Sequence, residues 1–378
     1  MPFTAHAADL AGLAAADRLR CLTPRSGSDF ASNDYLGLSR SAELRGALAE
    51  ALARGVPVGS GGSRLLRGNH DEHGALEAEA AAHWGSESAL FFGSGFAANA
   101  GLLATLPQRG DLIVHDALVH ASAHEGIRLS RAEATAFPHN DADAAEAAIV
   151  GWRARGGTGT PWIAVETLYS MDGDRAPLSD LAEVAARRDA VLLLDEAHAA
   201  GVFGEGGRGL GSDLHGRPNV VTLVTCGKAL GCEGALLLGP HVVRDHLVNR
   251  ARGFVFSTAP SPLIAAGVRA AIALVADQPE RRTRLAALCR HAEARLVPLG
   301  ATATGSQILP LLVGRDGAAM ALAAAAQAGG FDVRGIRPPT VPAGTARLRL
   351  SITLNIGEAE VDGLADLLAT QRIAGIAA

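Results

Sequence analysis

The sequence is almost without lysine, and this scarcity draws attention to the one lysine that it keeps. Lys228 is the only lysine among the 34 basic residues of the 378-residue chain. If compositional drift replaces lysine wherever arginine serves equally well, the surviving lysine marks a position where arginine does not serve. A primary amine forms an imine with an aldehyde, whereas a guanidinium does not and stays protonated. We therefore predict that Lys228 is a nucleophile, with a surface lysine on a turn as the alternative.

The chain is also poor in cysteine and in long apolar runs. Its four cysteines form no C-x-x-C pair, and a large core needs no disulfides, so we predict reduced thiols in a cytoplasmic protein. The stretch "MPFTAHAADLAGLAAADRLRCL" has no basic region followed by a long apolar one, and it is predicted to form an arm helix. No apolar run reaches the roughly 18 residues that span a bilayer, which argues against a membrane protein.

The charge balance argues against nucleic acid as a partner. The formal net charge is −5, and no basic run or stripe is present. With 48% hydrophobic and 19% charged residues, the composition is typical of a globular protein that buries a large core.

Short apolar runs that alternate with helical segments predict an α/β fold. The runs are rich in Val, Leu and Ile without polar alternation, which indicates strands buried on both faces of a mostly parallel sheet. We expect these strands at residues 88–93, 111–116, 134–139, 161–167, 190–196, 219–225 and 234–239.

The character of the sequence changes after about residue 260. A long helical region (261–297) is followed by "ILPLLVG", an alanine-rich helix and the strand-like "TARLRLSIT", which together predict a smaller α+β domain. The expected division is an N-terminal arm (1–45), a large cofactor-binding domain (46–265) and a small C-terminal domain (266–378).

The stretch "VTCGKALGCEGA" (224–235) places Lys228 directly after a predicted buried strand. Its small neighbours leave the backbone open to a flat ligand, and α/β folds bind ligands at the carboxyl ends of strands. A P-loop is excluded, because that motif needs a glycine at the position of Thr222 and a hydroxyl at that of Ala229.

Three further motifs suit a cofactor with a ring nitrogen and a phosphate. "LLLDEAHAAG" puts Asp195 at a strand end, where a carboxylate can keep a pyridine nitrogen protonated, and His198 can donate to a phenolic oxygen. In "FFGSGFAANAGLL" the N–H groups near Gly95 and Phe96 open a helix and can bind phosphate. In "LVHASA", His120 can stack on a ring. Each motif alone also suits a structural strand end or turn.

Two other patterns give negative predictions. His115, His120 and His124 recur at intervals of five and four, but no cysteine or acidic constellation completes a metal site, so we predict no metal. The glycine-rich "GSGGSRLLRG" (59–68) follows no predicted strand, and "GSGFAA" has Ala98 where a dinucleotide motif needs its third glycine.

The order of the motifs along the chain is more telling than any one of them. A phosphate-binding turn comes first, then a ring-stacking histidine, a strand-end aspartate and the lysine. This order predicts a pyridoxal 5'-phosphate (PLP) enzyme of the aspartate-aminotransferase-like fold, fold type I, with a mostly parallel sheet and a smaller α+β C-terminal domain.

The sequence resembles the α-oxoamine synthases, a family of PLP-dependent acyltransferases. The resemblance lies in "SNDYLGLS", "GSGGSRL", "SGFAAN", "SMDGD", "DEAH", "GEGGRG", "GKALG" and "IRPPTVPAGTARLRL", and it runs from about Asp17 to Ser351. "SMDGD" and "IRPPTVPAGTARLR" are most similar to the member that acts in biotin synthesis. The other motifs are shared with the glycine-using members.

The resemblance implies a role for each matching residue. Lys228, His120 and Asp195 would form the catalytic set, in which Lys228 holds the cofactor covalently and moves a substrate proton. The remaining cofactor contacts would be Gly95, Phe96, Ser170, His198, Thr225 and, from the neighbouring subunit, Ser257 and Thr258. The substrate contacts would be Arg20, Asn33, His120, Thr340 and Arg349, with Arg347 on the same strand face as the alternative to Arg349. A site completed by a neighbouring subunit implies at least a homodimer.

The implied reaction is the decarboxylative condensation of L-alanine with a pimeloyl thioester, carried on coenzyme A or on acyl carrier protein. A glycine-using relative would share the chemistry, and an aminotransferase would share the fold. Outside the enzymes, the alternative is a cofactor-binding sensor or an inactive partner subunit. Such partners often lose the lysine, whereas this chain keeps it.

Three positions depart from the family pattern. Cys226 stands where an aromatic residue is common, Thr167 where glycine is usual, and Glu196 makes "DEAH" of the commoner "DDAH". None of them removes a catalytic group, so they affect the expected shape of the pocket more than its chemistry.

Overall fold

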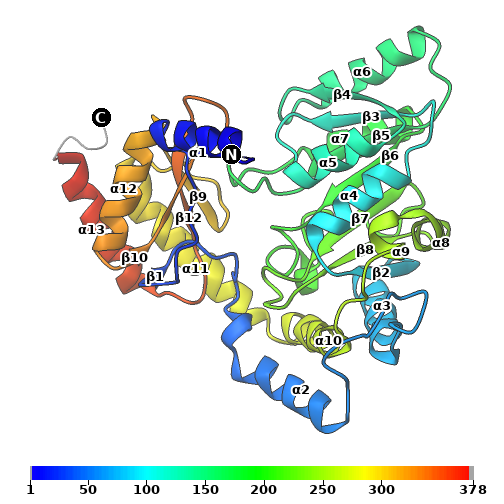
Figure 1. Ribbon diagram of the computed structural model, residues 1–378, viewed down its shortest axis with the longest axis horizontal. Helices are drawn as coiled ribbons and strands as arrows, with labels where there is room; N and C mark the ends of the chain where they lie inside the picture. The colour runs from blue at the N-terminus through cyan, green and yellow to red at the C-terminus, as the bar shows by residue number, and fades with distance from the viewer. Residues whose placement is uncertain (1, 374–378) are drawn as a thin grey trace. The chain divides into compact units, whose positions relative to one another are not determined.

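The computed structural model describes residues 2–373, which form two compact units (Figure 1). The larger unit holds residues 36–170 and 175–282, and the smaller unit holds residues 2–35, 171–174 and 283–373. The domain boundaries expected from the sequence, after residues 45 and 265, stay predictions.

A mixed sheet is the centre of the larger unit. Its strands lie in the order β2-β8-β7-β6-β5-β3-β4, and all neighbours are parallel except where β8 pairs with β2 and β7. The predicted α/β fold with a mostly parallel sheet is therefore confirmed. The strands are β2 (Ser88–Phe92), β3 (Leu112–Asp116), β4 (Glu133–Phe137), β5 (Pro161–Glu166), β6 (Val191–Asp195), β7 (Val220–Thr225) and β8 (Ala235–Gly239).

Two apolar layers bury this sheet on both faces. Successive residues of β6 alternate between them, with Leu193 in one layer and Leu192 and Leu194 in the other. This explains why the strands read as apolar runs without polar alternation. The first layer includes residues of α4 (Gly95–Thr105), α5 (Ala121–Leu129), α8 (His241–Arg250) and α9 (Arg252–Val255), and the second includes residues of α6 (Ala142–Ala154) and α7 (Leu178–Arg187).

The long helical region expected at 261–297 is two helices, α10 (Pro262–Asp277) and α11 (Pro279–Leu296). Ser261 caps α10 by accepting a hydrogen bond from the backbone N–H of Ile264. Pro279 has no N–H to donate, so the first helix ends before it and the second begins on it. In the larger unit α10 packs against α2 (Ala42–Ala53) and α3 (Asp71–Trp84).

The smaller unit contains an antiparallel sheet in the order β11-β12-β9. Arg347, Arg349 and Ser351 alternate along β12 and so share one face of it. A short parallel pair, β1 with β10, lies beside the helices of this unit. The strands are β1 (Ser28–Asp29), β9 (Ile308–Gly314), β10 (Phe331–Asp332), β11 (Arg334–Ile336) and β12 (Ala346–Ser351), and the helices are α1 (Thr4–Ala15), α12 (Asp316–Ala328) and α13 (Glu358–Ile373).

The predicted arm helix is present as α1, and none of its residues is buried. All four cysteines are free thiols. Within residues 2–373, no helix is both long and apolar enough to cross a membrane. The cytoplasmic location stays a prediction.

Candidate active site at the carboxyl edge of the large sheet

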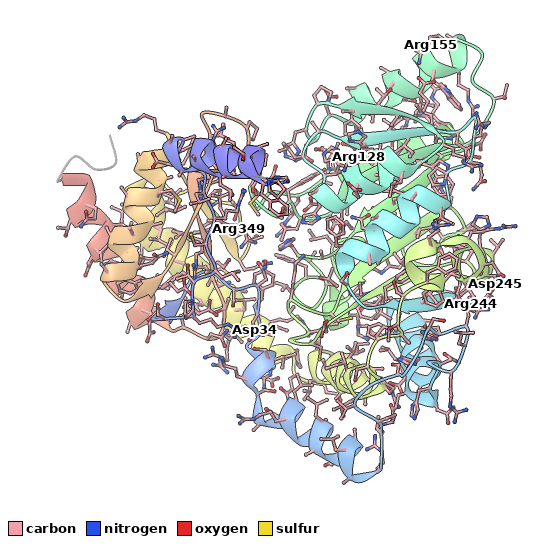
Figure 2. The ribbon with its side chains drawn as sticks, in the orientation of Figure 1. Asp34, Arg128, Arg155, Arg244, Asp245 and Arg349 are labelled. Atoms are coloured by element: carbon pink, nitrogen blue, oxygen red, sulfur yellow. The ribbon has the colours of Figure 1, made fainter. Side chains whose placement is uncertain are left out.

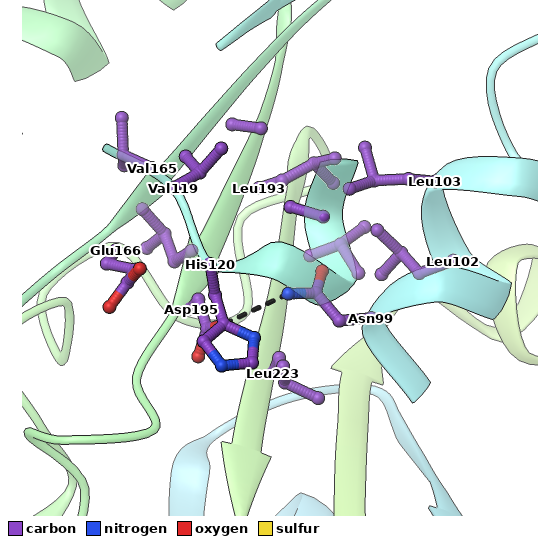
Figure 3. A pocket seen from close by; sticks show the side chains of 14 residues that line it. Asn99, Leu102, Leu103, Val119, His120, Val165, Glu166, Leu193, Asp195 and Leu223 are labelled. Carbon is purple, nitrogen blue, oxygen red and sulfur yellow. Dashed lines mark hydrogen bonds between the residues drawn. The ribbon is translucent and has the colours of Figure 1, made fainter. Parts of the chain in front are cut away.

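Asp195 ends β6 and lines a cavity at the carboxyl edge of the large sheet (Figure 3). Its Oδ2 accepts a hydrogen bond from Asn99 Nδ2 at 3.1 Å, and its Oδ1 accepts one from the backbone N–H of Ala197 at 3.0 Å. Burial raises the pKa of the carboxyl group, while the charge of Lys228 and the Ala197 N–H lower it. The two hydrogen bonds fix the orientation of the carboxyl group at the cavity.

His120 caps α5 and lines the same cavity. Its Nδ1 accepts a hydrogen bond from the backbone N–H of Ser122 at 3.2 Å and lies 2.8 Å from Ser122 Oγ, which in turn accepts one from Asn99 Nδ2 at 3.1 Å. A backbone N–H can only donate, so Nδ1 carries no proton and the ring is the Nε2–H form. Burial lowers the pKa of His120, with Asp195 opposing and Lys228 adding to the effect. The imidazole is therefore a neutral flat ring at neutral pH.

Lys228 lies in the turn that follows β7 and is half-buried. Its positive charge opposes the rise that burial causes in the pKa of Asp195 and of Glu166, and it adds to the fall in the pKa of His120, so its amine acts on all three groups around the cavity. The turn is closed by backbone hydrogen bonds from Gly231 N to Lys228 O at 2.8 Å and from Cys232 N to Cys226 O at 2.8 Å. The structure brings the predicted nucleophile together with the predicted aspartate and histidine.

The first turn of α4 forms the predicted phosphate end. Ser94 Oγ accepts the backbone N–H of Ala97 at 3.1 Å, and the earlier N–H groups of the helix have no partner within it. A Cβ on Gly95 would meet Thr225 Cγ2 at 2.7 Å, so glycine lets the helix start approach β7 closely. Thr225 Oγ1 donates to Ala197 O at 3.2 Å. Gly95, Phe96 and Thr225, predicted to bind phosphate, therefore come from one small region.

Ser170 and His198 are buried residues of the segments that follow β5 and β6. The backbone N–H of Ser170 donates to Glu166 Oε2 at 3.1 Å. Both residues lie in the loops at the carboxyl ends of neighbouring parallel strands, where the sequence places the contacts to the ring oxygen.

Ser257 and Thr258 are exposed residues that follow α9. The chain just after them is held by the glycine-rich loop 59–68: Ala259 N donates to Gly62 O at 2.8 Å, and Ser60 Oγ donates to Pro260 O at 2.5 Å. This loop therefore holds the segment at Ala259 and Pro260 in place.

Arg349 belongs to the smaller unit and is labelled in Figure 2. It is 6% exposed, and its guanidinium donates to Ser351 Oγ at 2.6 Å and to the Tyr35 hydroxyl at 3.3 Å. The Tyr35 hydroxyl donates onward to Asn33 Oδ1 at 3.0 Å. The structure thus joins two predicted substrate residues, Asn33 and Arg349, through Tyr35.

Arg347 makes a different set of contacts within the smaller unit. Its guanidinium pairs with the Asp172 carboxylate and donates to the backbone oxygens of Met171 and Thr345. Arg347 is therefore engaged by the "SMDGD" segment. The other two predicted substrate residues, Arg20 and Thr340, also meet, with Arg20 Nη2 donating to Thr340 Oγ1 at 3.3 Å.

Two of the three departures from the family pattern contact each other. Thr167 Oγ1 donates to Glu196 Oε2 at 2.8 Å, and the same carboxylate accepts the backbone N–H groups of Leu210 and Gly211. The carboxylate of Glu196 therefore connects the end of β5, through Thr167, to the loop that contains Leu210 and Gly211. Cys226 is buried, and nothing in the structure explains why a cysteine stands there.

Three residues of the site were not predicted from the sequence: Asn99, Ser122 and Glu166. Asn99 follows Gly95 by one helical turn, which places both on the same face of α4. Glu166 ends a buried apolar strand as Asp195 does, and that shared position was an available signal. The rings of His115 and His124 pack edge to face against each other, with their centroids 5.3 Å apart.

The groups around the cavity fit PLP by their chemistry. Lys228 offers an amine for the aldehyde, Asp195 a carboxylate for the ring nitrogen, and His120 a neutral ring for stacking. The glycine at position 95 lets the start of α4 lie against Thr225, and the N–H groups of a helix start suit a phosphate.

Comparisons with known proteins agree with this chemistry. A family model described as aminotransferase class I and II matches residues 26–368. An 8-amino-7-oxononanoate synthase of Anaeromyxobacter dehalogenans (strain 2CP-1) is 45% identical over 344 residues, covering 90% of this chain and 85% of the relative. A solved serine palmitoyltransferase of S. paucimobilis with bound PLP–myriocin has a TM-score of 0.88 at 26% identity, covering 99% and 98% of the two chains. An 8-amino-7-oxononanoate synthase of Francisella tularensis has a TM-score of 0.76 at 25% identity, covering 93% and 99%.

Replacing Gly95 with alanine should weaken PLP binding about ten-fold or more, because the new methyl group collides with Thr225 and moves the helix start. Gly101→Ala is the matched control in the same helix, since its methyl group would lie 3.9 Å from Phe92, an ordinary contact. Titration of the two apo-proteins with PLP measures the affinities, and their melting temperatures check folding. Equal affinities in the two variants would contradict the assignment of this turn.

Proposed function

Because the chain belongs to the 8-amino-7-oxononanoate synthases of the class I and II aminotransferase family, we propose that it condenses L-alanine with a pimeloyl thioester in biotin biosynthesis. The products are 8-amino-7-oxononanoate, carbon dioxide and the free thiol carrier. PLP is the cofactor. The observation that carries the proposal is the position of the only lysine, whose charge acts on Asp195 and His120 around one cavity.

Three residues of the larger unit would hold the cofactor ring. Lys228 supplies the amine that binds the aldehyde, Asp195 accepts the hydrogen bond of a protonated ring nitrogen, and His120 presents a neutral ring for stacking. Bound PLP withdraws electrons from the substrate carbon that carries the amino group. The remaining proposed contacts are Ser170 and His198 to the ring oxygen, and Gly95, Phe96 and Thr225 to the phosphate.

Lys228 would also move the proton of the reaction. With PLP and alanine bound, the amine of Lys228 would take the proton from the α-carbon of alanine. A bond from that carbon to the thioester carbonyl then forms as the thiolate leaves. The former alanine carboxylate departs as carbon dioxide, and a proton returned to the carbon gives the amino-ketone.

We propose Arg349, rather than Arg347, as the residue that binds the alanine carboxylate. The hydrogen bonds of Arg349 to the hydroxyl groups of Ser351 and Tyr35 orient its guanidinium, and Tyr35 links it to Asn33, another proposed substrate contact. The charge of Arg347 is countered by Asp172. A guanidinium grips a carboxylate through two parallel hydrogen bonds, which fixes the substrate's orientation. Arg20, Asn33 and Thr340 are the other proposed substrate contacts.

We further propose a homodimer in which Ser257 and Thr258 reach the phosphate of the partner subunit's site. Both are exposed, and Phe256 beside them is 73% exposed. Phe96, at the phosphate end of α4, is 50% exposed. Exposed aromatic side chains beside a binding site are typical of surfaces that another chain covers.

The proposed reaction is tested by the thiol that it releases. The purified protein with PLP should release thiol from pimeloyl-coenzyme A or pimeloyl-acyl carrier protein when L-alanine is added, and the better donor identifies the carrier. Lys228→Arg keeps the charge near Asp195 but removes the nucleophile, so its rate should fall at least about a thousand-fold. Faster release with glycine and a short acyl thioester would indicate a glycine-using relative instead, and amino transfer to a keto acid would indicate an aminotransferase.

Arg349→Gln should raise the KM for L-alanine about 100-fold, because a charge-assisted pair with the carboxylate is lost. Arg347→Gln, on the same face of β12, is the matched control and should change this KM far less. PLP affinity should stay unchanged in both variants. A larger effect on KM from Arg347→Gln would reverse the assignment.

Mixed dimers test the shared site. Lys228→Arg subunits and Ser257→Ala/Thr258→Ala subunits should each be nearly inactive alone. After the two are unfolded together and refolded, about a quarter of wild-type activity should return, because half of the dimers are mixed and each has one intact site. If the mixture shows only the sum of the parent activities, these residues do not act across subunits.

A further inference from the structure

Glu166 is a buried acid that the proposed reaction does not use. It ends β5 directly beside Asp195, its partner in the parallel pair of β5 and β6. Its side chain lines the same cavity as Asp195 and His120, as Figure 3 shows, and the residue is 2% exposed. Two carboxyl groups therefore meet at one edge of the sheet.

The hydrogen bonds of Glu166 satisfy only one of its oxygens. Oε2 accepts the backbone N–H of Ser170 at 3.1 Å, whereas Oε1 is buried with no hydrogen-bond partner among the described residues. An ionised carboxylate with an unsatisfied buried oxygen is costly, because it loses the hydration of a full charge. A protonated Oε1 carries no such charge and can donate its hydrogen to a ligand in the cavity.

The surrounding charges also favour the neutral form. Asp195 and Asp116 place negative charge near Glu166, and the positive charge of Lys228 opposes them. His120, which shares the cavity, is neutral. Asp195 accepts hydrogen bonds from Asn99 and from the backbone N–H of Ala197. These bonds stabilise a negative charge on Asp195 better than on Glu166, and Lys228 can balance that one charge. Burial, with Asp195 adding to it, raises the pKa of Glu166 to about 8.

We propose that Glu166 is a further residue of the site: it stays a neutral carboxylic acid and presents Oε1–H as a hydrogen-bond donor to an acceptor oxygen in the cavity. The acceptor is either the ring oxygen of PLP or an oxygen of the amino-acid substrate. This inference rests on the proposed function for the identity of the ligand. The protonation of Glu166 itself does not, since it follows from the protein alone.

The protonation is tested on the apo-protein, without cofactor or substrate. A carboxyl whose pKa is raised in the folded state makes the protein lose stability as the pH rises from its ordinary value, near 4.5, to about 8. Glu166→Gln, an isostere of the neutral acid, lacks this loss. The melting temperature of Glu166→Gln minus that of the wild type should therefore increase between pH 5 and pH 8. This difference should stay constant above pH 8. Parallel curves for the two proteins would overturn the proposal.

The donor role is tested by binding. Glu166→Gln keeps a donor and should bind PLP at pH 7 within about two-fold of the wild type, whereas Glu166→Met keeps the volume without a donor. If the acceptor belongs to PLP, the methionine variant should bind PLP about ten-fold more weakly. If the acceptor belongs to the substrate, PLP affinity is kept and the dissociation constant of L-alanine, measured from the absorption spectrum of the holoenzyme, should rise about ten-fold instead.

Unchanged binding of both ligands by Glu166→Met would overturn the donor role. A protein that binds no PLP in any form would instead contradict the proposed function, and the melting curves of the apo-protein would still decide the protonation of Glu166. The two failures are therefore distinguishable.

Discussion

One ammonium group facing two carboxyl groups is the constraint on which the rest of the site depends. Parallel strands end at the same edge of the sheet, so Glu166 and Asp195, each the last residue of its strand, are forced to be neighbours. Burial raises the pKa of both carboxyls, and the positive charge of Lys228 opposes that rise at each of them. The amine therefore stabilises the site as well as supplying its nucleophile. Arginine could supply the charge but not the imine-forming amine.

A single helix and a chain of hydrogen bonds order the groups around this charge. Gly95 lets the start of α4 lie close to Thr225, and Asn99 one turn later donates a hydrogen bond to the carboxyl group of Asp195. Asn99 also donates to Ser122 Oγ, and the backbone N–H of Ser122 fixes the tautomer of His120. One helix thus helps to position Asp195, His120 and the turn that is predicted to bind phosphate.

The sequence was sufficient for those features that leave a local signal. The strands were predictable because burial on both faces makes each of them a continuous apolar run, as the alternation of Leu192 and Leu193 between two layers shows. Lys228 was predictable because a nearly lysine-free composition isolates it. The expectation of one helical region over 261–297 did not include the break at Pro279, where α10 ends and α11 begins.

Other features depend on which strands become neighbours, which no local pattern states. Glu166 matters because β5 lies next to β6, and Asn99 because α4 crosses the end of β6 within hydrogen-bonding distance. Thr167 and Glu196 each depart from the family pattern, and nothing in the sequence connects the two positions. The structure shows that their side chains form a hydrogen bond. The roles of the substrate residues, including the proposed choice of Arg349 over Arg347, come from family resemblance and stay predictions.

The most direct measurement is to locate the amine that binds PLP. The holoenzyme is reduced with borohydride, digested and analysed by mass spectrometry. The account predicts the reduced cofactor on the peptide that contains Lys228, the only lysine of the chain, and on no other peptide. If the reduced cofactor were found only on the N-terminal α-amino group of the protein, or on no peptide at all, the assignment of Lys228 would be contradicted.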